Sequence, residues 1–193
     1  MNQWFASDLQ FQLLYPEAAH AQASMHWTPL HIARKAAEFL AVEKNVRVLD
    51  IGSGAGKFCL AAAYYQPDAF FYGVEQRGEL VTCAETAAAT LGLQNVSFTH
   101  TNITEADFRK YDHFYFFNSF YENLDSGYRI DENIQYSKEL YSTYNRFVYK
   151  QLEKKIGGTR LATFHSMEDE IPTSFYEVAS TDDGLLKFWI KVY

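Results

Sequence analysis

Short apolar runs alternate with longer amphipathic segments along this chain. Runs rich in Val, Ile, Phe and Tyr are typical of buried strands, and apolar residues at helical spacing lie between them. The pattern predicts strands at 46–51, 70–75, 96–101, 111–117 and 159–165, with helices at 57–65, 79–91 and 138–155. This alternation favours an α/β fold with a mostly parallel sheet and helices on both faces.

The patterns at the two ends of the chain are consistent with a single domain, residues 1–193. Thr28-Pro29 predicts a helix start, because Thr can cap free N–H groups and Pro fits the first helical turn. Residues 174–193 are typical of two strands joined by an Asp-Asp-Gly turn. The hairpin would give seven strands in all, with an antiparallel C-terminal edge. Residues 1–27 are polar and mixed, and we expect an N-terminal extension of one helix and a loop.

Charge and composition narrow the classes of function. The chain has 17 basic and 24 acidic side chains, a net charge of −7, which argues against a nucleic-acid partner held mainly through its phosphates. The two cysteines, Cys59 and Cys83, fall in predicted helices, so we expect two reduced, buried thiols and neither a disulfide framework nor a metal site. The sequence shows no apolar run of membrane-spanning length and no secretory signal, which favours a cytoplasmic protein without membrane contact.

A glycine-rich loop follows the first predicted strand. Asp50 precedes Gly52-Ser53-Gly54-Ala55-Gly56, and Lys57 stands where a dinucleotide-binding loop would have its third glycine. The chain also has no triphosphate-binding pattern. The segment 48–56 closely resembles motif I of the class I methyltransferases that use S-adenosylmethionine (SAM).

The resemblance implies a Rossmann-like fold with SAM as the cofactor. In this family the loop wraps the methionine half of SAM, here through Gly52, Ser53, Gly54 and Gly56, and the acid, here Asp50, organises the loop and the ligand's ammonium group. Three further residues follow predicted strands and are expected to bind SAM as well. Glu75 would accept hydrogen bonds from the ribose hydroxyls, and the region of the adenine would be lined by Asn102 and Ile103.

The residues after the fourth strand are the candidates for catalysis. Asn118-Ser119-Phe120-Tyr121 resembles the N-P-P-Y motif of amino-group methyltransferases, in which the Asn oxygen accepts a hydrogen bond from the target amine and the aromatic ring stacks on a planar substrate. Both prolines are absent here. We assign Asn118 and Tyr121 as catalytic positioning residues, and Asn118 also as a cofactor contact.

A second resemblance covers residues 48–163, which look like the catalytic core of the non-SET histone-lysine methyltransferases. It implies methyl transfer to a nitrogen of a protein side chain, without implying a nucleosome substrate. A small-molecule amine, a nucleobase, or a SAM-binding partner protein without catalysis remain as alternatives, and the acceptor atom, N, O or C, stays open. Weaker candidates for the site are Trp27 or Thr28 near the ligand and His165 as a base. The 122–135 loop either closes over or reads the substrate, or is a plain surface excursion, and the sequence favours neither.

Overall fold

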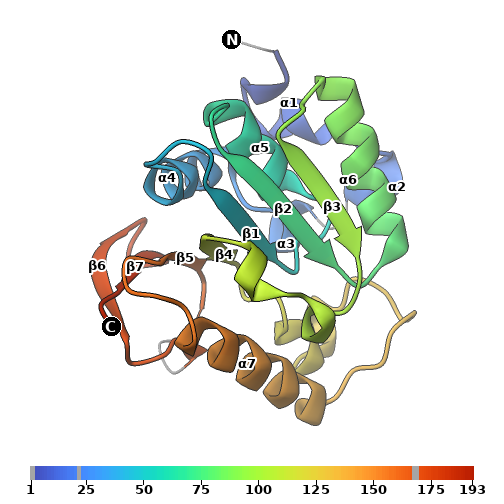
Figure 1. Ribbon diagram of the computed structural model, residues 1–193. Coiled ribbons are helices and arrows are strands. Elements are labelled where there is room, and N and C mark those ends of the chain that lie inside the picture. Colours follow the sequence, from blue (N-terminus) through green and yellow to red (C-terminus); the bar gives the residue numbers. More distant parts are fainter. Residues whose placement is uncertain (1–2, 21–22, 167–169) are drawn as a thin grey trace.

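The computed structural model describes residues 3–20, 23–166 and 170–193, which form one sheet flanked by helices (Figure 1). The strands are β1 (Arg47–Ile51), β2 (Phe70–Glu75), β3 (Val96–His100), β4 (His113–Phe116), β5 (Arg160–Phe164), β6 (Phe175–Thr181) and β7 (Leu186–Lys191). The helices are α1 (Asp8–Gln12), α2 (Glu17–His20), α3 (Ala23–His26), α4 (Leu30–Leu40), α5 (Lys57–Tyr65), α6 (Gly78–Leu91) and α7 (Lys138–Glu153).

The strand order of the sheet is β3-β2-β1-β4-β5-β7-β6. The first five strands pair in parallel, and β7 pairs antiparallel with both β5 and β6. The predicted seven-stranded, mostly parallel sheet with a C-terminal antiparallel hairpin is therefore confirmed. The order reverses between β1 and β4, and ligands of open α/β sheets bind at such a switch point, outside the carboxyl ends of the strands.

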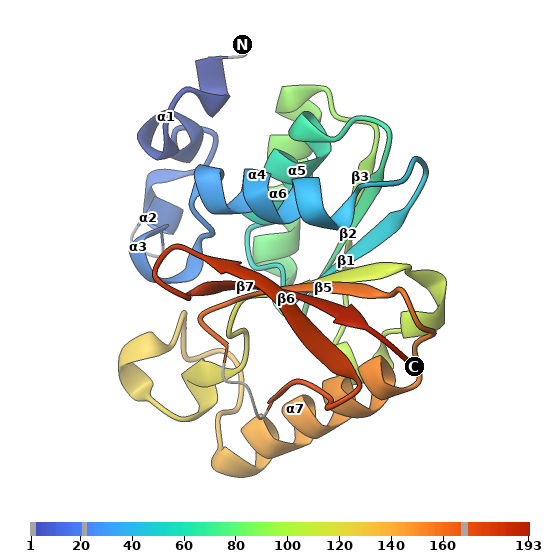
Figure 2. The same ribbon diagram turned by 90° about the vertical axis from the view of Figure 1, so that its left-hand side faces the viewer.

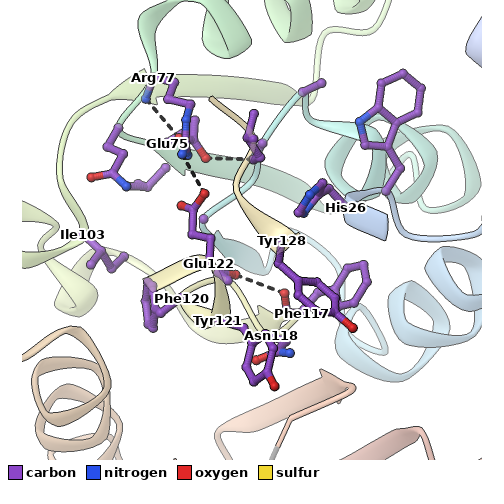
Figure 3. A pocket seen from close by; sticks show the side chains of 18 of the residues that line it. His26, Glu75, Arg77, Ile103, Phe117, Asn118, Phe120, Tyr121, Glu122 and Tyr128 are labelled. Atoms are coloured by element: carbon purple, nitrogen blue, oxygen red, sulfur yellow. Dashed lines mark hydrogen bonds and ion pairs between the residues drawn. The ribbon is translucent and has the colours of Figure 1, made fainter. Parts of the chain in front are cut away.

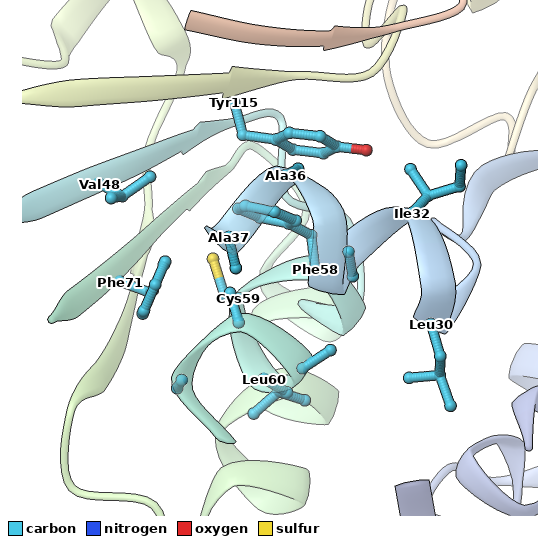
Figure 4. Packing of buried hydrophobic residues seen from close by; sticks show 14 of the residues in the cluster. Leu30, Ile32, Ala36, Ala37, Val48, Phe58, Cys59, Leu60, Phe71 and Tyr115 are labelled. Carbon is cyan, nitrogen blue, oxygen red and sulfur yellow. The ribbon is translucent and has the colours of Figure 1, made fainter. Parts of the chain in front are cut away.

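The sheet separates two hydrophobic cores because successive residues of a strand face opposite sides. Val48 packs with the residues of α4 and α5, whereas Leu49 and Ile51 pack with those of α7. Figure 2 shows α4, α5 and α6 on one side of the sheet and α7 on the other. In the first core, the rings of Phe58 and Tyr115 stack with centroids 3.7 Å apart (Figure 4).

The N-terminal segment differs from the expected helix and loop. Its described part forms a 3-10 turn at Gln3–Phe5 and the short helices α1, α2 and α3, and residues 1–2 and 21–22 lie outside the described chain. The Tyr15 hydroxyl donates a hydrogen bond to Ala55 O at 2.9 Å, and Asp8 pairs with the buried ammonium of Lys57. These two contacts hold the segment against the glycine-rich loop. Its apolar and aromatic side chains also pack on α5.

The boundaries of the predicted strands and helices agree with the structure to within two residues. The strands expected at 96–101 and 111–117 are shorter, because Thr101 and Tyr111 lie in the turns that connect them to short 3-10 segments. Cys59 is buried as expected, but Cys83 is only half-buried on α6. Across the described residues, no helix has both the length and the apolar character needed to cross a membrane.

Gly56 provides a test of how tightly the loop is packed. Its φ is +81°, and a Cβ would lie 2.6 Å from the Phe98 ring and 2.7 Å from Ala84 Cβ. Gly184 has the same φ of +81° with open space around it. We expect Gly56→Ala to lower the free energy of unfolding by about 2–4 kcal/mol, from left-handed strain and overpacking.

Gly184→Ala is the matched control, with a loss of about 1 kcal/mol from backbone strain alone. Urea unfolding followed by circular dichroism measures both values. Equal losses in the two variants would contradict the tight packing of the loop against α6 and β3.

Candidate functional site

A cavity of about 500 Å³ opens at the carboxyl ends of the parallel strands (Figure 3). Its size falls in the range of small-molecule and cofactor sites. The glycine-rich loop, the end of β2 and the segment after β4 contribute to its wall, together with residues from the N-terminal segment and from the end of β5. The cavity therefore lies at the switch point of strand order, where the sequence predicted a ligand.

Two glycines of the loop bring backbone to the cavity. Gly54 lines it with φ +53°, and a Cβ at this position would meet no atom within 4 Å. Gly52 also lines it, and a Cβ there would lie 2.6 Å from Ser119 Cβ. The Ser119 hydroxyl donates a hydrogen bond to Ile51 O, which joins the segment after β4 to the loop after β1. Gly52 is thus required for this close approach, whereas Gly54 leaves room for a ligand.

Ser53 and Gly56, two predicted cofactor contacts, do not line the main cavity. Gly56 faces Phe98 and Ala84, away from it, so its role in the fold is the left-handed backbone that starts α5. Ser53 borders a smaller neighbouring cavity, where its buried hydroxyl finds no hydrogen-bond partner among residues 3–20, 23–166 and 170–193. The sequence could not separate these residues from Gly52 and Gly54, because the direction of each backbone group depends on the path of the loop.

Asp50 lies beneath the loop, not in the main cavity. It is 4% exposed, accepts a hydrogen bond from Cys59 Sγ at 3.5 Å and borders the smaller cavity. Burial raises the pKa of Asp50 to about 8, with Glu75 adding to the rise and the Cys59 contact opposing it. The carboxyl group of Asp50 is therefore suited to supporting the loop from below. It does not line the main cavity.

Glu75 has the position expected of an acid that binds a ribose. It lines the cavity at the end of β2 while only 5% exposed. Its Oε2 accepts a hydrogen bond from Gly54 N at 3.1 Å, and its Oε1 accepts one from Arg77 N at 3.0 Å. Burial raises the pKa of Glu75 despite these two donors and the Arg77 charge. Glu75 thus joins the glycine-rich loop to the end of β2.

Arg77 is a cavity residue that the sequence did not single out. Its guanidinium contacts the carboxylates of Glu75, Glu122 and Asp131, at 3.5, 2.7 and 2.8 Å, and it is 7% exposed. It lies two residues after Glu75, at the start of α6. The acids after β4 were visible in the sequence, but no spacing rule connects them with a residue more than 40 positions earlier.

Asn102 and Ile103 both line the cavity, with different chemistry. The Asn102 amide donates to Tyr144 Oη at 3.0 Å and to Gln76 Oε1 at 3.3 Å, while its oxygen accepts from Thr104 N at 3.0 Å. These bonds make Asn102 the cap of a short turn. The buried side chain of Ile103 offers an apolar surface, as an adenine ring would require.

Asn118 and Tyr121, the predicted catalytic residues, meet at one side of the cavity (Figure 3). Asn118 has a left-handed backbone with φ +41°, and no hydrogen bond engages its side-chain amide among the described residues. The Tyr121 ring meets that of Tyr128 edge to face, with centroids 5.0 Å apart. Phe117 lies on the same side, so an amide that is free to bind stands next to several aromatic rings.

The N-terminal segment and the end of β5 complete the wall. Trp27 is 5% exposed and lines the cavity, and its buried Nε1–H has no hydrogen-bond partner in the part of the chain that the structure describes. His26 and His165 also line it, and burial lowers the pKa of both imidazoles. The lowered pKa values favour the neutral form of both rings. Thr28 is buried instead, in a hydrogen bond of 3.0 Å with Tyr115 Oη.

These features fit the parts of SAM. The glycine backbone suits the methionine part of SAM, the buried acid suits the ribose, and the apolar surface of Ile103 suits the adenine. The Trp27 Nε1–H, which has no hydrogen-bond partner among the described residues, offers a donor to an acceptor group of a ligand. Within the described residues, no group of three or more His, Cys, Asp or Glu side chains could hold a metal ion.

Comparison with known proteins identifies the family. Residues 42–180 match the profile of a family described as a methyltransferase domain. The chain belongs to this methyltransferase family. This match confirms the predicted methyltransferase, and solved methyltransferases share its class I fold.

Two curated relatives share shorter segments. A tRNA (guanine-N(7)-)-methyltransferase of Synechococcus sp. (strain JA-3-3Ab) is 53% identical over 55 residues, covering 28% of this chain and 23% of the relative. A 23S rRNA (uracil(1939)-C(5))-methyltransferase of Shewanella sediminis is 42% identical over 79 residues, covering 41% and 17%. The chain spans less than a quarter of the length of either relative. Their names do not support the expectation that nucleic acid is an unlikely partner.

Two solved structures share the fold. An RNA methyltransferase of Salinibacter ruber in complex with S-adenosyl-L-homocysteine superposes with a TM-score of 0.59 at 19% identity, covering 86% of this chain and 93% of that one. A SAM-dependent O-methyltransferase of Thermotoga maritima gives a TM-score of 0.57 at 17% identity, covering 92% and 72%. At these identities the likeness extends to the architecture alone.

Asp50 makes the stability of the protein depend on pH. Its pKa is about 8 in the folded protein, above the value of about 3.9 in unfolded chains. Between these values the folded protein keeps a proton that the unfolded chain has lost, so stability falls as pH rises. From pH 4 to 8 the free energy of unfolding falls by about 1.4 kcal/mol per pH unit, and outside this range Asp50 makes no contribution to the pH dependence.

We therefore expect the wild type to lose about 3 kcal/mol more than Asp50→Asn between pH 5 and 7.5. Urea unfolding at the two pH values measures this difference. Asp183→Asn, at an exposed position, makes the same change from a carboxyl to an amide group and should keep the wild-type pH dependence. A wild type and an Asp50→Asn variant with parallel pH profiles would exclude a buried, protonated Asp50.

Proposed function

We propose that this protein transfers the methyl group of SAM to a nitrogen of a planar ring, with a nucleobase as the nearest chemical class. The observation that carries the proposal is the unengaged amide of Asn118, which stands at the end of β4 beside Tyr121 and Phe117. A flat acceptor can stack on aromatic side chains while an amide oxygen accepts a hydrogen bond from its N–H.

The donor is held by the loop, the end of β2 and the turn after β3. When bound, SAM supplies an electrophilic methyl group on a positively charged sulfur. The backbone of Gly54 faces the ligand, Glu75 accepts hydrogen bonds from the ribose hydroxyls, and Ile103 packs on the adenine. Asp50 supports the loop from beneath, and Asn102 fixes the turn that presents Ile103.

The acceptor is held on the opposite side of the reacting methyl group. Asn118 orients the acceptor nitrogen so that its lone pair is aligned with the methyl carbon, and Tyr121 and Phe117 hold the ring in its plane. Methyl transfer is an in-line displacement: the nitrogen–carbon bond would form as the carbon–sulfur bond breaks, S-adenosylhomocysteine would leave, and the proton of the acceptor N–H would pass to solvent. A fixed approach angle and the exclusion of water during the displacement contribute much of the rate. None of these residues forms a covalent bond with the substrate.

Other acceptors are consistent with the same amide and remain to be tested. The sequence favoured a nitrogen of a protein side chain, and a side-chain amide or amine also fits next to Asn118. We place the nucleobase first because the wall is aromatic and because the two relatives described above are named for tRNA and rRNA. The net charge of −7 describes the whole chain and carries no information about this pocket.

The donor site can be tested with a pair of glycine variants. Gly54 and Gly92 both have positive φ, at +53° and +69°, with open space at the Cβ position, but only Gly54 lines the cavity. We expect Gly54→Ala to weaken the binding of S-adenosylhomocysteine by at least about tenfold, because the methyl group occupies ligand space. Gly92→Ala should lose similar stability and keep wild-type affinity.

Isothermal titration calorimetry with S-adenosylhomocysteine measures the three affinities. If Gly54→Ala and Gly92→Ala both bind S-adenosylhomocysteine with the affinity of the wild type, the ligand binds away from this loop. No binding by the wild type would overturn the proposed function.

The acceptor side is tested by Asn118→Gly, which removes the amide at a left-handed position that glycine adopts without strain. We expect transfer of a radiolabelled methyl group to fall about 100-fold, because misplaced reacting atoms lose roughly that much rate. The affinity for S-adenosylhomocysteine should change far less than the rate. An undiminished rate would show that Asn118 does not position the acceptor.

The assay offers hypomethylated RNA, protein and small-molecule fractions separately to the wild type. Label in RNA supports a nucleobase acceptor, and label in protein would instead support a side-chain nitrogen. Binding of S-adenosylhomocysteine with no label in any fraction would favour a partner protein without catalysis of its own.

A further inference from the structure

The guanidinium of Arg77 joins the donor side of the cavity to the segment that follows β4. The main-chain N–H of Arg77 donates to Glu75 Oε1 at 3.0 Å, and Nη1 of its guanidinium donates to the same oxygen at 3.5 Å. Its Nη2 donates to Glu122 Oε2 at 2.7 Å and to Tyr136 Oη at 2.9 Å, and its Nε donates to Asp131 Oδ2 at 2.8 Å. These five residues are called the Arg77 cluster below.

The cluster fixes a defined arrangement because it is buried and charged. The side chains of Arg77, Glu75 and Glu122 are only 6–7% exposed, and that of Asp131 is 26% exposed. Breaking a buried ion pair leaves an uncompensated charge, so each of these contacts is costly to lose. The acidic neighbours raise the pKa of Arg77 even against its own burial, which keeps the guanidinium charged.

The segment 124–136 is a loop with a closed base. At the base, Ser137 N donates to Asn123 Oδ1 at 3.4 Å, so the two ends of the loop lie together. Between these ends, Tyr128 and Ile130 line the cavity, with the Tyr128 ring against that of Tyr121. Asp131 in the middle of the loop and Tyr136 next to its base both bind Arg77.

We propose that Arg77 is a positioning residue that couples the donor site to the acceptor loop 124–136. The proposal rests on the proposed function, since it requires that the donor binds at Glu75 and the acceptor next to Tyr121. A donor held by Glu75 fixes that carboxylate, the carboxylate fixes Arg77, and Arg77 holds Asp131 and Tyr136. The acceptor-side wall formed by Tyr128 and Ile130 is then ordered best when the donor is present.

Coupling of this kind is reciprocal, because it is a free energy shared between two sites. A donor that stabilises the loop must bind less tightly when the loop loses its attachment to Arg77. An arginine suits this role better than a lysine would, because its planar fork holds several acceptors in fixed directions at once. The loop is therefore a conditional part of the acceptor site, where the sequence left a lid and a plain surface excursion as equal alternatives.

Asp131→Asn removes the loop's charged contact and leaves Glu75, Glu122 and Arg77 in place. The amide keeps an oxygen for the turn bond from Asn133 N, which is 2.7 Å from Asp131 Oδ1 in the wild type. Glu132→Gln is the matched control: it makes the same change of charge one residue further on, at a side chain 79% exposed whose ion-pair partner is Arg129 and not Arg77.

The readout is hydrogen–deuterium exchange in peptides covering 124–136, with and without saturating S-adenosylhomocysteine. We expect the ligand to slow exchange of the loop at least about fivefold in the wild type and in Glu132→Gln, the lower end of typical coupling between sites. In Asp131→Asn this protection should be lost, and the affinity for S-adenosylhomocysteine should fall several-fold. Peptides from α5 and β1 should be protected by the ligand in all three proteins.

Two results would overturn the inference and separate it from the proposed function. Binding of S-adenosylhomocysteine to the wild type without slower exchange in the loop, or equal protection in Asp131→Asn, would show that Arg77 does not couple the two sides. In either case the proposed methyl transfer stands. Absence of binding by the wild type would instead overturn the proposed function and this inference with it.

Discussion

The site depends on one buried carboxylate. Glu75 accepts a hydrogen bond from Gly54 N in the loop after β1 and another from Arg77 N at the start of α6, and it also faces the Arg77 guanidinium. A buried carboxylate is stable only when such donors replace the water it has lost. The hydrogen bonds to the Glu75 carboxylate fix the path of the glycine-rich loop and the orientation of Arg77. Through Asp131, Arg77 in turn holds the loop after β4.

The two sides of the cavity are built differently, and the difference suits a transferase. The donor side is rigid, since left-handed glycines, the turn cap at Asn102 and the buried support from Asp50 are fixed by the fold itself. The acceptor side is aromatic and is carried partly by a loop held through polar contacts, where chemistry can be varied without disturbing the core. A fold shared with an RNA methyltransferase and an O-methyltransferase can thus serve different acceptors.

Sequence patterns predicted the sheet, because hydrophobic periodicity and turn residues act locally. They also predicted Glu75, Ile103, Asn118 and Tyr121 at the cavity, since the carboxyl ends of parallel strands converge. The same motif suggested that Ser53 and Gly56 face the ligand, but they lie outside the main cavity, Gly56 in contact with Phe98 and Ala84. A motif gives the path of a chain, whereas the direction of each group depends on what packs behind it.

The sequence by itself determined the α/β architecture, the methyltransferase family and the strand ends at which the chemistry is placed. Only the tertiary structure decided which residues share the pocket. It packed the N-terminal segment against the glycine-rich loop through Tyr15, and it brought Arg77 together with Glu122 and Asp131, 45 and 54 residues away. These contacts arise because buried charges and hydroxyls must find partners in space, and no local spacing in a sequence records which partners those are.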